Sequence, residues 1–329
     1  MPNLQTKYLG LNLRNPLIVG SSGLTDSVEK IVELEKCGVG AVVLKSLFEE
    51  EITLEYEKLQ KEANENGMSN EALDYLDFKI KQDNLNKYLT LIKEVKEKTF
   101  IPVIASIHCF SAHEWLYFAK KIESAGADAL ELNVFLSPAD RTLKTTEKEL
   151  LYVNLAKKIK SEIKIPVALK ISSYSASLSQ LIVDLSNVGI DGLVLFNRFF
   201  SPDFDIDNFK ILHTSFLSSA NDYIMPLRWI SMLSGIVGTD FSATTGIHNG
   251  QTVLKMLLAG AKTVQIVSTL YKNGTFYLQT ILDEMERWME KHGFETIAEF
   301  RGKMAQQKTN NPEVYERMQF MKYFSGYQK

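Results

Sequence analysis

The 329-residue sequence has few cysteines, no long apolar run and no excess of basic charge. Its two cysteines, Cys37 and Cys109, are too few for a disulfide framework and lack the spacing of a zinc site. So few thiols in a long chain favour a reducing compartment. With 37 basic and 40 acidic residues the formal net charge is −3, which provides no basic face for nucleic acid or an anionic membrane.

The chain shows neither a targeting segment nor a membrane segment. Residues 1–16 lack the apolar core of a signal peptide, and no uninterrupted apolar run reaches the roughly 18 residues that cross a bilayer. We therefore expect a cytoplasmic protein that binds neither a membrane nor nucleic acid.

Eight short apolar runs, rich in β-branched residues, alternate with longer segments of helical pattern. The runs are 16–22, 41–46, 102–107, 129–133, 166–171, 192–197, 240–245 and 263–267. Continuous apolar strands are typical of a parallel sheet that helices cover on its outer side. In the intervening segments, such as 27–38, apolar residues recur three and four positions apart. Eight such units predict a (β/α)8 TIM barrel.

An open, doubly wound sheet is the alternative architecture. It usually carries a G-x-G-x-x-G turn after the first strand, and here that strand is followed by GSSGLTDS. A (β/α)8 barrel typically needs about 250 residues. We place the surplus in a polar insertion at about 47–81, after the second strand, and in a C-terminal helical tail at about 301–329. The chain 1–329 is thus expected to form a single domain.

Polar side chains stand at the carboxyl ends of nearly all the predicted strands, where barrel enzymes collect their chemistry. These are Ser22, Ser46, Ser106, His108, Asn133, Ser172 and Asn197, together with the two lysines Lys45 and Lys170. A lysine that closes an apolar run is costly to desolvate without an anionic partner. The two lysines therefore predict an anion or an electron-rich ring between them.

The last third of the chain predicts a phosphate site. The turn at Thr245 and Gly246 leads into a helix that begins near Asn249, and the next strand ends at Ser268 and Thr269. Backbone N–H groups at such a turn and hydroxyls beside it bind phosphate well. A phosphorylated metabolite and flavin mononucleotide (FMN) fit this pattern equally.

In their order along the chain, these motifs resemble the dihydroorotate dehydrogenase family of FMN-containing barrels, and most closely its class 1 cytosolic members. The resemblance extends from Asn15 to about Lys303. It is carried by Asn15-Pro16, Ser22-Gly23, Lys45-Ser46, Asn64-x-x-Gly67-x-x-Asn70, Glu131-Leu132-Asn133, Lys170, Asn197, Tyr223-Ile224-x-Pro226, the turn at Gly246-Ile247, and Gly293-Phe294 with the segment 297–303.

The resemblance implies FMN as cofactor, no metal, a small-molecule substrate and a homodimer. The cofactor-binding residues that it implies are Ser22, Lys45, Ser46, Asn133, Lys170, Asn197, Thr245, Gly246, Ser268 and Thr269. The substrate-binding residues are Asn64, Gly67, Met68, Asn133, Asn197 and Arg198.

The sequence departs from the family in the loop that carries the catalytic base. Family members have Asn-x-x-Cys/Ser-Pro-Asn there, whereas residues 133–140 read NVFLSPAD. Aligned on Asn133 the base position is Leu136, and aligned on Pro138 it is Ser137. We expect Ser137 to be the base, although a serine needs a proton acceptor of its own. Lys45 is the second expected catalytic residue, as a cation beside the flavin ring. His108 is the alternative base.

Other departures affect specificity and the phosphate site. Ala139 stands where the family has a substrate-binding Asn, and Arg198 where it has Ser or Thr. The segment 218–221 reads SSAN in place of a glycine-rich loop, and Thr245 replaces the first glycine of the phosphate turn.

The resemblance therefore implies an FMN-dependent oxidoreductase of pyrimidine biosynthesis. It would oxidise dihydroorotate, or a related dihydropyrimidine, by hydride transfer to flavin N5, with a soluble electron acceptor. Two alternatives remain open: a flavin-binding paralogue that is non-catalytic or differs in specificity, and a lyase that forms a Schiff base with a phosphorylated substrate through Lys170.

Overall fold

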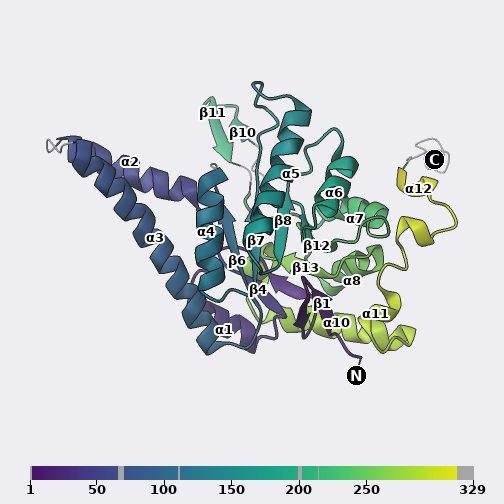
Figure 1. The fold of residues 1–329 in the computed structure, drawn as a ribbon. Helices are drawn as coiled ribbons and strands as arrows, with labels where there is room; N and C mark the ends of the chain where they lie inside the picture. Colours follow the sequence, from purple (N-terminus) through teal and green to yellow (C-terminus); the bar gives the residue numbers. More distant parts are fainter. Residues whose placement is uncertain (1, 66–69, 110–111, 199–201, 214, 317–329) are drawn as a thin grey trace.

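The computed structural model describes residues 2–65, 70–109, 112–198, 202–213 and 215–316. Eight parallel strands form a closed ring in it (Figure 1). Around the ring they follow the order β4 (Ala41–Val43), β3 (Leu17–Val19), β13 (Thr263–Ile266), β12 (Asp240–Thr244), β9 (Gly192–Leu195), β8 (Val167–Ile171), β7 (Ala129–Asn133) and β6 (Val103–His108), and β6 pairs with β4 to close it. The predicted (β/α)8 barrel is confirmed, and each strand lies within or beside its predicted run.

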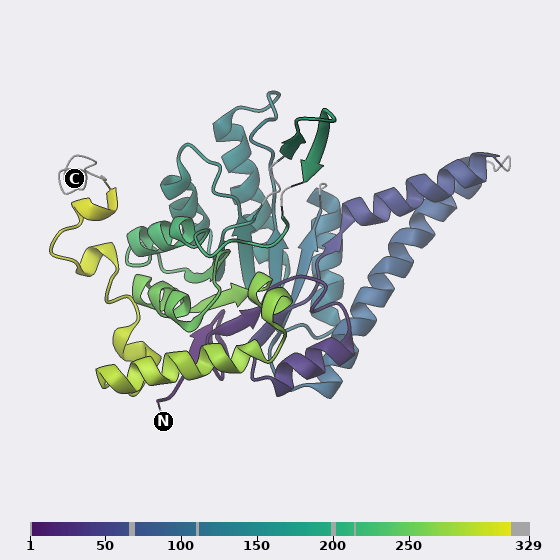
Figure 2. The same cartoon turned by 180° about the vertical axis from the view of Figure 1, so that it is seen from behind.

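Helices surround the ring of strands (Figures 1 and 2). They are α1 (Val28–Lys36), α4 (Ala112–Ser124), α5 (Thr145–Glu162), α6 (Leu178–Asn187), α7 (Ile224–Leu233), α8 (Gly250–Ala259), α9 (Ser268–Asn273) and α10 (Tyr277–His292). Each strand carries apolar side chains toward both the helices and the ring interior. The fully buried β6 illustrates why continuous apolar runs identify such strands.

A short hairpin closes the amino-terminal end of the barrel. It consists of β1 (Thr6–Tyr8) and β2 (Leu11–Leu13), and Tyr8 at its turn is completely buried. Tyr8 and Leu9 pack with inward-facing strand residues such as Ile18 and Val194. Gly192 allows this approach, because a Cβ there would lie 2.5 Å from a methyl carbon of Leu9.

The insertion after β4 is a long helical hairpin. The two-residue β5 (Leu47–Phe48) leads into α2 (Glu49–Glu65) and then α3 (Asn70–Lys98), and both helices project from the barrel (Figures 1 and 2). With 29 residues, α3 is about 43 Å long. The predicted insertion is confirmed, but its helix continues beyond residue 81, since the second half of α3 packs on the barrel through buried Leu85, Ile92 and Val95.

Two further segments lie outside the ring of strands and its surrounding helices. After β9 the chain forms an exposed antiparallel hairpin of β10 (Pro202–Asp205) and β11 (Lys210–His213), which the sequence patterns did not predict. Of the C-terminal helical tail predicted at about 301–329, residues 301–316 are described; they follow α11 (Ile297–Phe300) and contain η1 (Gln306–Lys308) and α12 (Glu313–Glu316), whereas residues 317–329 lie outside the described part of the chain. None of the helices described is long and apolar enough to cross a membrane.

Candidate active site

A cavity of about 190 Å³, here called the mouth cavity, lies at the carboxyl ends of the strands. Polar groups from five strand ends line it: Ser21, Lys170, Asn197, Thr245, Gly246, Gln265 and Ser268. A larger cavity of about 520 Å³, the side cavity, adjoins it and shares Phe196, Asn197, Arg198 and Thr245 with it. The structure therefore brings together the predicted cofactor-binding residues of β8, β9, β12 and β13.

The Lys170 side chain lines the mouth cavity from β8 and contacts Gln265 and Glu131. Its Nζ lies 3.5 Å from Oε1 of Gln265 and 3.9 Å from Oε1 of Glu131. Gln265 in turn donates a 2.5 Å hydrogen bond from Nε2 to Oε2 of Glu131. Burial raises the pKa of Glu131, and Lys170 and Gln265 oppose that rise. Gln265 was not predicted as a site residue, although a glutamine inside an apolar strand run is a visible signal.

Lys45 follows β4 but does not reach the mouth cavity in this structure. Its Nζ lies 3.3 Å from Oε2 of Glu51, in the first turn of α2, and its side chain is 43% exposed. It lines a separate cavity of about 360 Å³ beside α2 and α3. The predicted convergence of Lys45 and Lys170 on one cavity is therefore not observed, because the nearby carboxylate of Glu51 attracts the Lys45 ammonium.

Three hydroxyls join the ends of β3, β4 and β6. Oγ of the buried Ser46 lies 3.0 Å from Oγ of Ser21 and 2.7 Å from Oγ of Ser106. Ser21 lines the mouth cavity, whereas the Ser22 hydroxyl donates to the carbonyl oxygen of Gly20. At the end of β3 it is thus Ser21, the residue before the predicted one, whose side chain faces the cavity.

Asn133 is the last residue of β7, and Asn197 follows β9, on the other side of β8. Asn133 is paired with Lys170 in the β7–β8 register, and its carbonyl oxygen lies 2.5 Å from Nδ1 of His108. The Asn197 side-chain amide donates to the carbonyl oxygens of Lys170 and Val134, at 3.4 and 3.5 Å. His108 is mostly buried against Phe48 and Trp115. Its ring nitrogen therefore positions the end of β7.

The predicted phosphate turn has an unusual backbone. Thr245 and Gly246 both have positive φ, +77° and +74°. A Cβ at Gly246 would lie 2.2 Å from the amide nitrogen of Tyr223, so this position requires glycine. A β-branched residue at positive φ is strained, whereas glycine would adopt the backbone of Thr245 without that cost.

Ser218 connects the altered phosphate loop to the turn and to α9. Its backbone N–H donates to Oγ of Ser268 at 2.9 Å, and its carbonyl oxygen accepts from Nζ of Lys272 at 2.8 Å. Its hydroxyl lies 3.0 Å from Nε2 of His248. Ser268 lines the mouth cavity, but Thr269 is fully buried and donates to the carbonyl oxygen of His248, so its hydroxyl has a structural role here.

Arg198 borders both the mouth cavity and the side cavity. Its guanidinium donates to the carbonyl oxygens of Ser215 and Phe216, and its Nε lies 3.5 Å from Oδ2 of Asp222. Burial raises the pKa of Asp222, but hydrogen bonds from Ser219 and the charge of Arg198 outweigh burial and lower it. Arg198 thus organises the segment after β11 and still presents positive charge at the cavity rim.

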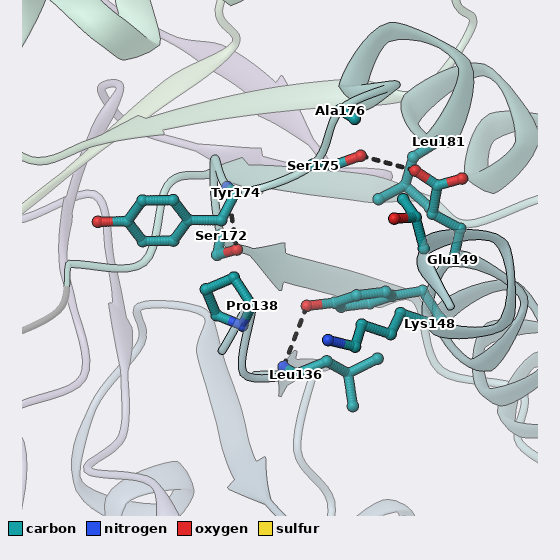
Figure 3. Close-up of a pocket in the computed structure, with 11 residues that line it drawn as sticks. Leu136, Pro138, Lys148, Glu149, Ser172, Tyr174, Ser175, Ala176 and Leu181 are labelled. Carbon is teal, nitrogen blue, oxygen red and sulfur yellow. Dashed lines mark hydrogen bonds between the residues drawn. The ribbon is translucent and has the colours of Figure 1, made fainter. Parts of the chain in front are cut away.

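The expected base, Ser137, lies in an exposed loop. Its Oγ accepts a 3.3 Å hydrogen bond from the Ala139 amide. Its neighbours Leu136 and Pro138 line a fourth cavity of about 220 Å³ between α5 and the β8–α6 loop, here called the loop cavity (Figure 3). There the Tyr152 hydroxyl accepts from the Leu136 amide at 3.3 Å. Ser137 itself lines none of the four cavities described here.

Of Asn64, Gly67 and Met68, which were expected to bind substrate, the structure describes the backbone of Asn64 alone. The backbone of Asn64 is in the last turn of α2. The carboxyl-terminal end of α2 points away from the barrel (Figure 1). Gly67 and Met68 lie outside the described residues. The structure therefore does not bring the backbone of Asn64 to the mouth cavity. Among the residues described, no group of three His, Cys, Asp or Glu side chains could hold a metal ion.

Comparison with known proteins agrees with the barrel and its motifs. A family model described as dihydroorotate dehydrogenase matches residues 3–289. The catalytic subunit of dihydroorotate dehydrogenase B (NAD(+)) from Thermoplasma volcanium is 26% identical over 313 residues, covering 92% of this chain and 98% of the relative. The corresponding proteins of Thermoplasma acidophilum and Bacillus mycoides are 24% and 25% identical, each over 92% of this chain and over 99% and 97% of their own lengths.

FMN, the cofactor of this family, suits the donors at the barrel mouth. The Lys170 ammonium and the Asn197 amide match the polar edge of a flavin ring, and the turn at Gly246 with the Ser268 hydroxyl matches a phosphate. Because a family model covers most of the sequence, the chain belongs to the dihydroorotate dehydrogenase family of FMN-dependent oxidoreductases, which act on a CH–CH group.

Proposed function

We propose that this protein oxidises dihydroorotate, or a closely related dihydropyrimidine, in pyrimidine biosynthesis. The observation that carries the proposal is the convergence of Lys170, Asn197, Gly246 and Ser268 on one cavity at the barrel mouth. When bound there, FMN supplies the hydride acceptor, flavin N5. The chain supplies orientation, charge and a route for the proton.

Four groups hold the cofactor in this proposal. Gly246 and Ser268 bind its phosphate, while Lys170 offers a cation to the edge of the ring, where reduction increases negative charge. Asn197, already bonded to the backbone at Lys170 and Val134, presents its remaining polar atoms toward ring and substrate. Ser22, Ser46, Asn133 and Thr245 remain proposed contacts, as does Thr269, although its hydroxyl bonds to His248 here.

Lys45 remains in the proposed catalytic set despite its contact with Glu51. The pair is exposed on both sides, with 43% of the Lys45 side chain and 59% of that of Glu51 accessible. Exposed ion pairs of this kind contribute only about 0–1 kcal/mol. Lys45 can therefore leave Glu51 for an anionic partner at little cost.

Proton removal is assigned to Ser137. Its loop is exposed, so as Ser137 takes the substrate proton its own hydroxyl proton can pass to solvent water. His108 is the alternative base. Its Nδ1 donates to the Asn133 carbonyl, which leaves Nε2 as the accepting nitrogen of the neutral ring.

The substrate contacts and the assembly are further proposals. Asn133, Asn197 and Arg198 would contact the substrate, and Asn64, Gly67 and Met68 remain proposed substrate contacts. The relatives named as catalytic subunits of an NAD(+)-linked enzyme support electron transfer to a soluble acceptor through a second subunit. We also propose a homodimer in the cytoplasm.

An anaerobic spectrum tests this function. The purified protein, saturated with FMN, should be yellow, and dihydroorotate should bleach its absorbance near 450 nm. A yellow protein that dihydroorotate and other dihydropyrimidines leave oxidised would overturn the proposed reaction. The exposed position of Ser137 favours that second candidate, a flavin-binding protein of other specificity. A colourless protein whose Lys170 is trapped by borohydride would instead indicate the lyase.

A further inference from the structure

A buried hydrogen bond crosses the barrel directly beneath the mouth cavity. Glu131 lies on β7 and Gln265 on β13, four strands away in the ring of eight, and Gln265 Nε2 donates to Glu131 Oε2. Glu131 is 1% exposed and Gln265 is 2% exposed. Only Gln265 and Lys170 of this trio line the cavity, so Glu131 stands behind them.

The contacts fix the orientation of the Gln265 amide. Its oxygen accepts from the Lys170 ammonium, so its nitrogen must be the group that faces the carboxylate. One side chain therefore connects the buried acid to the cation at the cavity. Exchanging the two ends of this amide would place a donor against the ammonium and an acceptor against the carboxylate.

Burial raises the pKa of Glu131, but the two polar groups nearest to its carboxyl, Lys170 and Gln265, favour the ionised form. Its Oε1 has no hydrogen-bond partner among the residues described, and the Lys170 ammonium faces it at 3.9 Å. A protonated Oε1 would need an acceptor, and a cation cannot serve as one. The amide donor from Gln265 likewise stabilises a carboxylate.

An ionised Glu131 changes the charge that the cavity experiences. Lys170 alone would present a full positive charge to the ring edge of a bound flavin. A carboxylate directly behind it, in a buried region where charges are weakly screened, cancels much of that potential. The position and the effective charge of Lys170 are thus both set by a residue that does not touch the cavity.

We propose that Glu131 is a positioning residue for the flavin chemistry. Through Gln265 it fixes Lys170 at the mouth cavity, and its negative charge lowers the reduction potential of the bound FMN. This inference rests on the proposed function, because it concerns the same cofactor site. It assigns to Glu131 and Gln265 a control of electron affinity rather than contact with substrate.

The midpoint potential of the bound FMN tests the proposal. In an anaerobic titration against reference dyes, Glu131→Gln should favour the reduced flavin at least tenfold over wild type, about 30 mV for a two-electron couple. Glu131→Asp keeps the charge and should remain within threefold of wild type. Lys170→Met should shift the equilibrium toward oxidised flavin. Glu149, a half-buried residue that lines the loop cavity, provides the matched control. Glu149→Gln should leave the midpoint potential unchanged.

A second variant keeps the test decisive if Glu131→Gln fails to fold. Gln265→Met removes both hydrogen bonds without adding charge, which weakens the stabilisation of the carboxylate, and should also raise the potential. The inference is overturned if the FMN of Glu131→Gln has the wild-type midpoint potential. If Glu131→Gln does not fold, a wild-type potential in Gln265→Met overturns it instead. Bleaching of the wild-type protein by dihydroorotate would still uphold the proposed function. A wild-type protein that takes up no FMN would overturn both.

Discussion

Nζ of Lys148, in the first turns of α5, lies 2.9 Å from the carbonyl oxygen of Ser137. The same ammonium donates to the carbonyl oxygen of Asp140 at 2.6 Å, and Tyr152 on α5 accepts from the Leu136 amide. Three groups of the loop are therefore attached to one helix. The position of the proposed base depends on α5 rather than on the strand that precedes the loop.

Replacing Ser137 tests the assignment of the base. Ser137→Ala should slow flavin reduction by dihydroorotate by about 10²- to 10⁴-fold, the usual contribution of a general base. FMN binding should not change, because Ser137 lines none of the described cavities. Stopped-flow bleaching near 450 nm measures the rate. Ser161→Ala on α5 is the control, and a Ser137→Ala rate equal to wild type would transfer the role to another group, with His108→Gln as the next variant.

Replacing Lys148 tests whether the loop must be held in place. Lys148→Met removes two hydrogen bonds to the loop and leaves every residue of the mouth cavity intact. We expect bleaching by dihydroorotate to slow about tenfold, because misplacement of a reacting group by about 1 Å can cost still more. The affinity for FMN should stay at the wild-type value. Lys148→Arg should restore part of the rate, whereas Lys158→Met, an exposed position on the same helix, should match wild type.

The barrel was predictable because its strands are buried on both faces. Segments such as 103–108 are therefore continuous apolar runs that can be recognised in the sequence. The helical hairpin was harder to predict. Residues 49–60 of α2 are mostly exposed and charged, and most of the described apolar residues that pack on the barrel, such as Leu85 and Ile92, come in the second half of α3.

The site shows a similar division. Lys170 and Asn197 were found because strand ends in a barrel converge, and that convergence follows from topology alone. Local geometry could not be predicted from the sequence. Whether Ser21 or Ser22 faces the mouth cavity depends on one residue of register. The direction of the Lys45 side chain depends on Glu51, six residues further along the chain. Gln265 was overlooked because its run was interpreted only as a strand.

Thr245 provides a test of backbone strain in the phosphate turn. At φ +77° a β-branched residue is strained, and glycine would adopt the same backbone without that cost. Thr245→Gly should therefore raise the free energy of unfolding by about 1 kcal/mol, after the entropy that glycine gains in the unfolded chain is subtracted. Urea denaturation measures the change, and a variant less stable than wild type would show that the hydrogen bond from Thr245 to Phe196 outweighs the strain.

Gly246 is the counterpart of this prediction. A Cβ there would lie 2.2 Å from the Tyr223 amide nitrogen, and the glycine also has positive φ. Gly246→Ala should lower the free energy of unfolding by more than about 2 kcal/mol and weaken FMN binding, because the turn must move. Gly126→Ala, at positive φ with open space around it, isolates the backbone effect from the collision. Equal losses in the two variants would contradict the role assigned to the contact with Tyr223.

His248 makes the stability of the phosphate region depend on pH. Burial lowers its pKa, the Lys272 ammonium lowers it further, and contacts with Ser218 and Asp222 only partly compensate. Because the folded pKa lies below the unfolded value of about 6.5, the unfolded chain binds the additional proton first. This contribution to stability is present above about pH 6.5 and is lost as the pH falls. Urea unfolding of the FMN-saturated protein between pH 7 and pH 5 should show the loss, and both His248→Gln and Lys272→Met should reduce it. An unchanged pH dependence in His248→Gln would show that other groups govern acid stability.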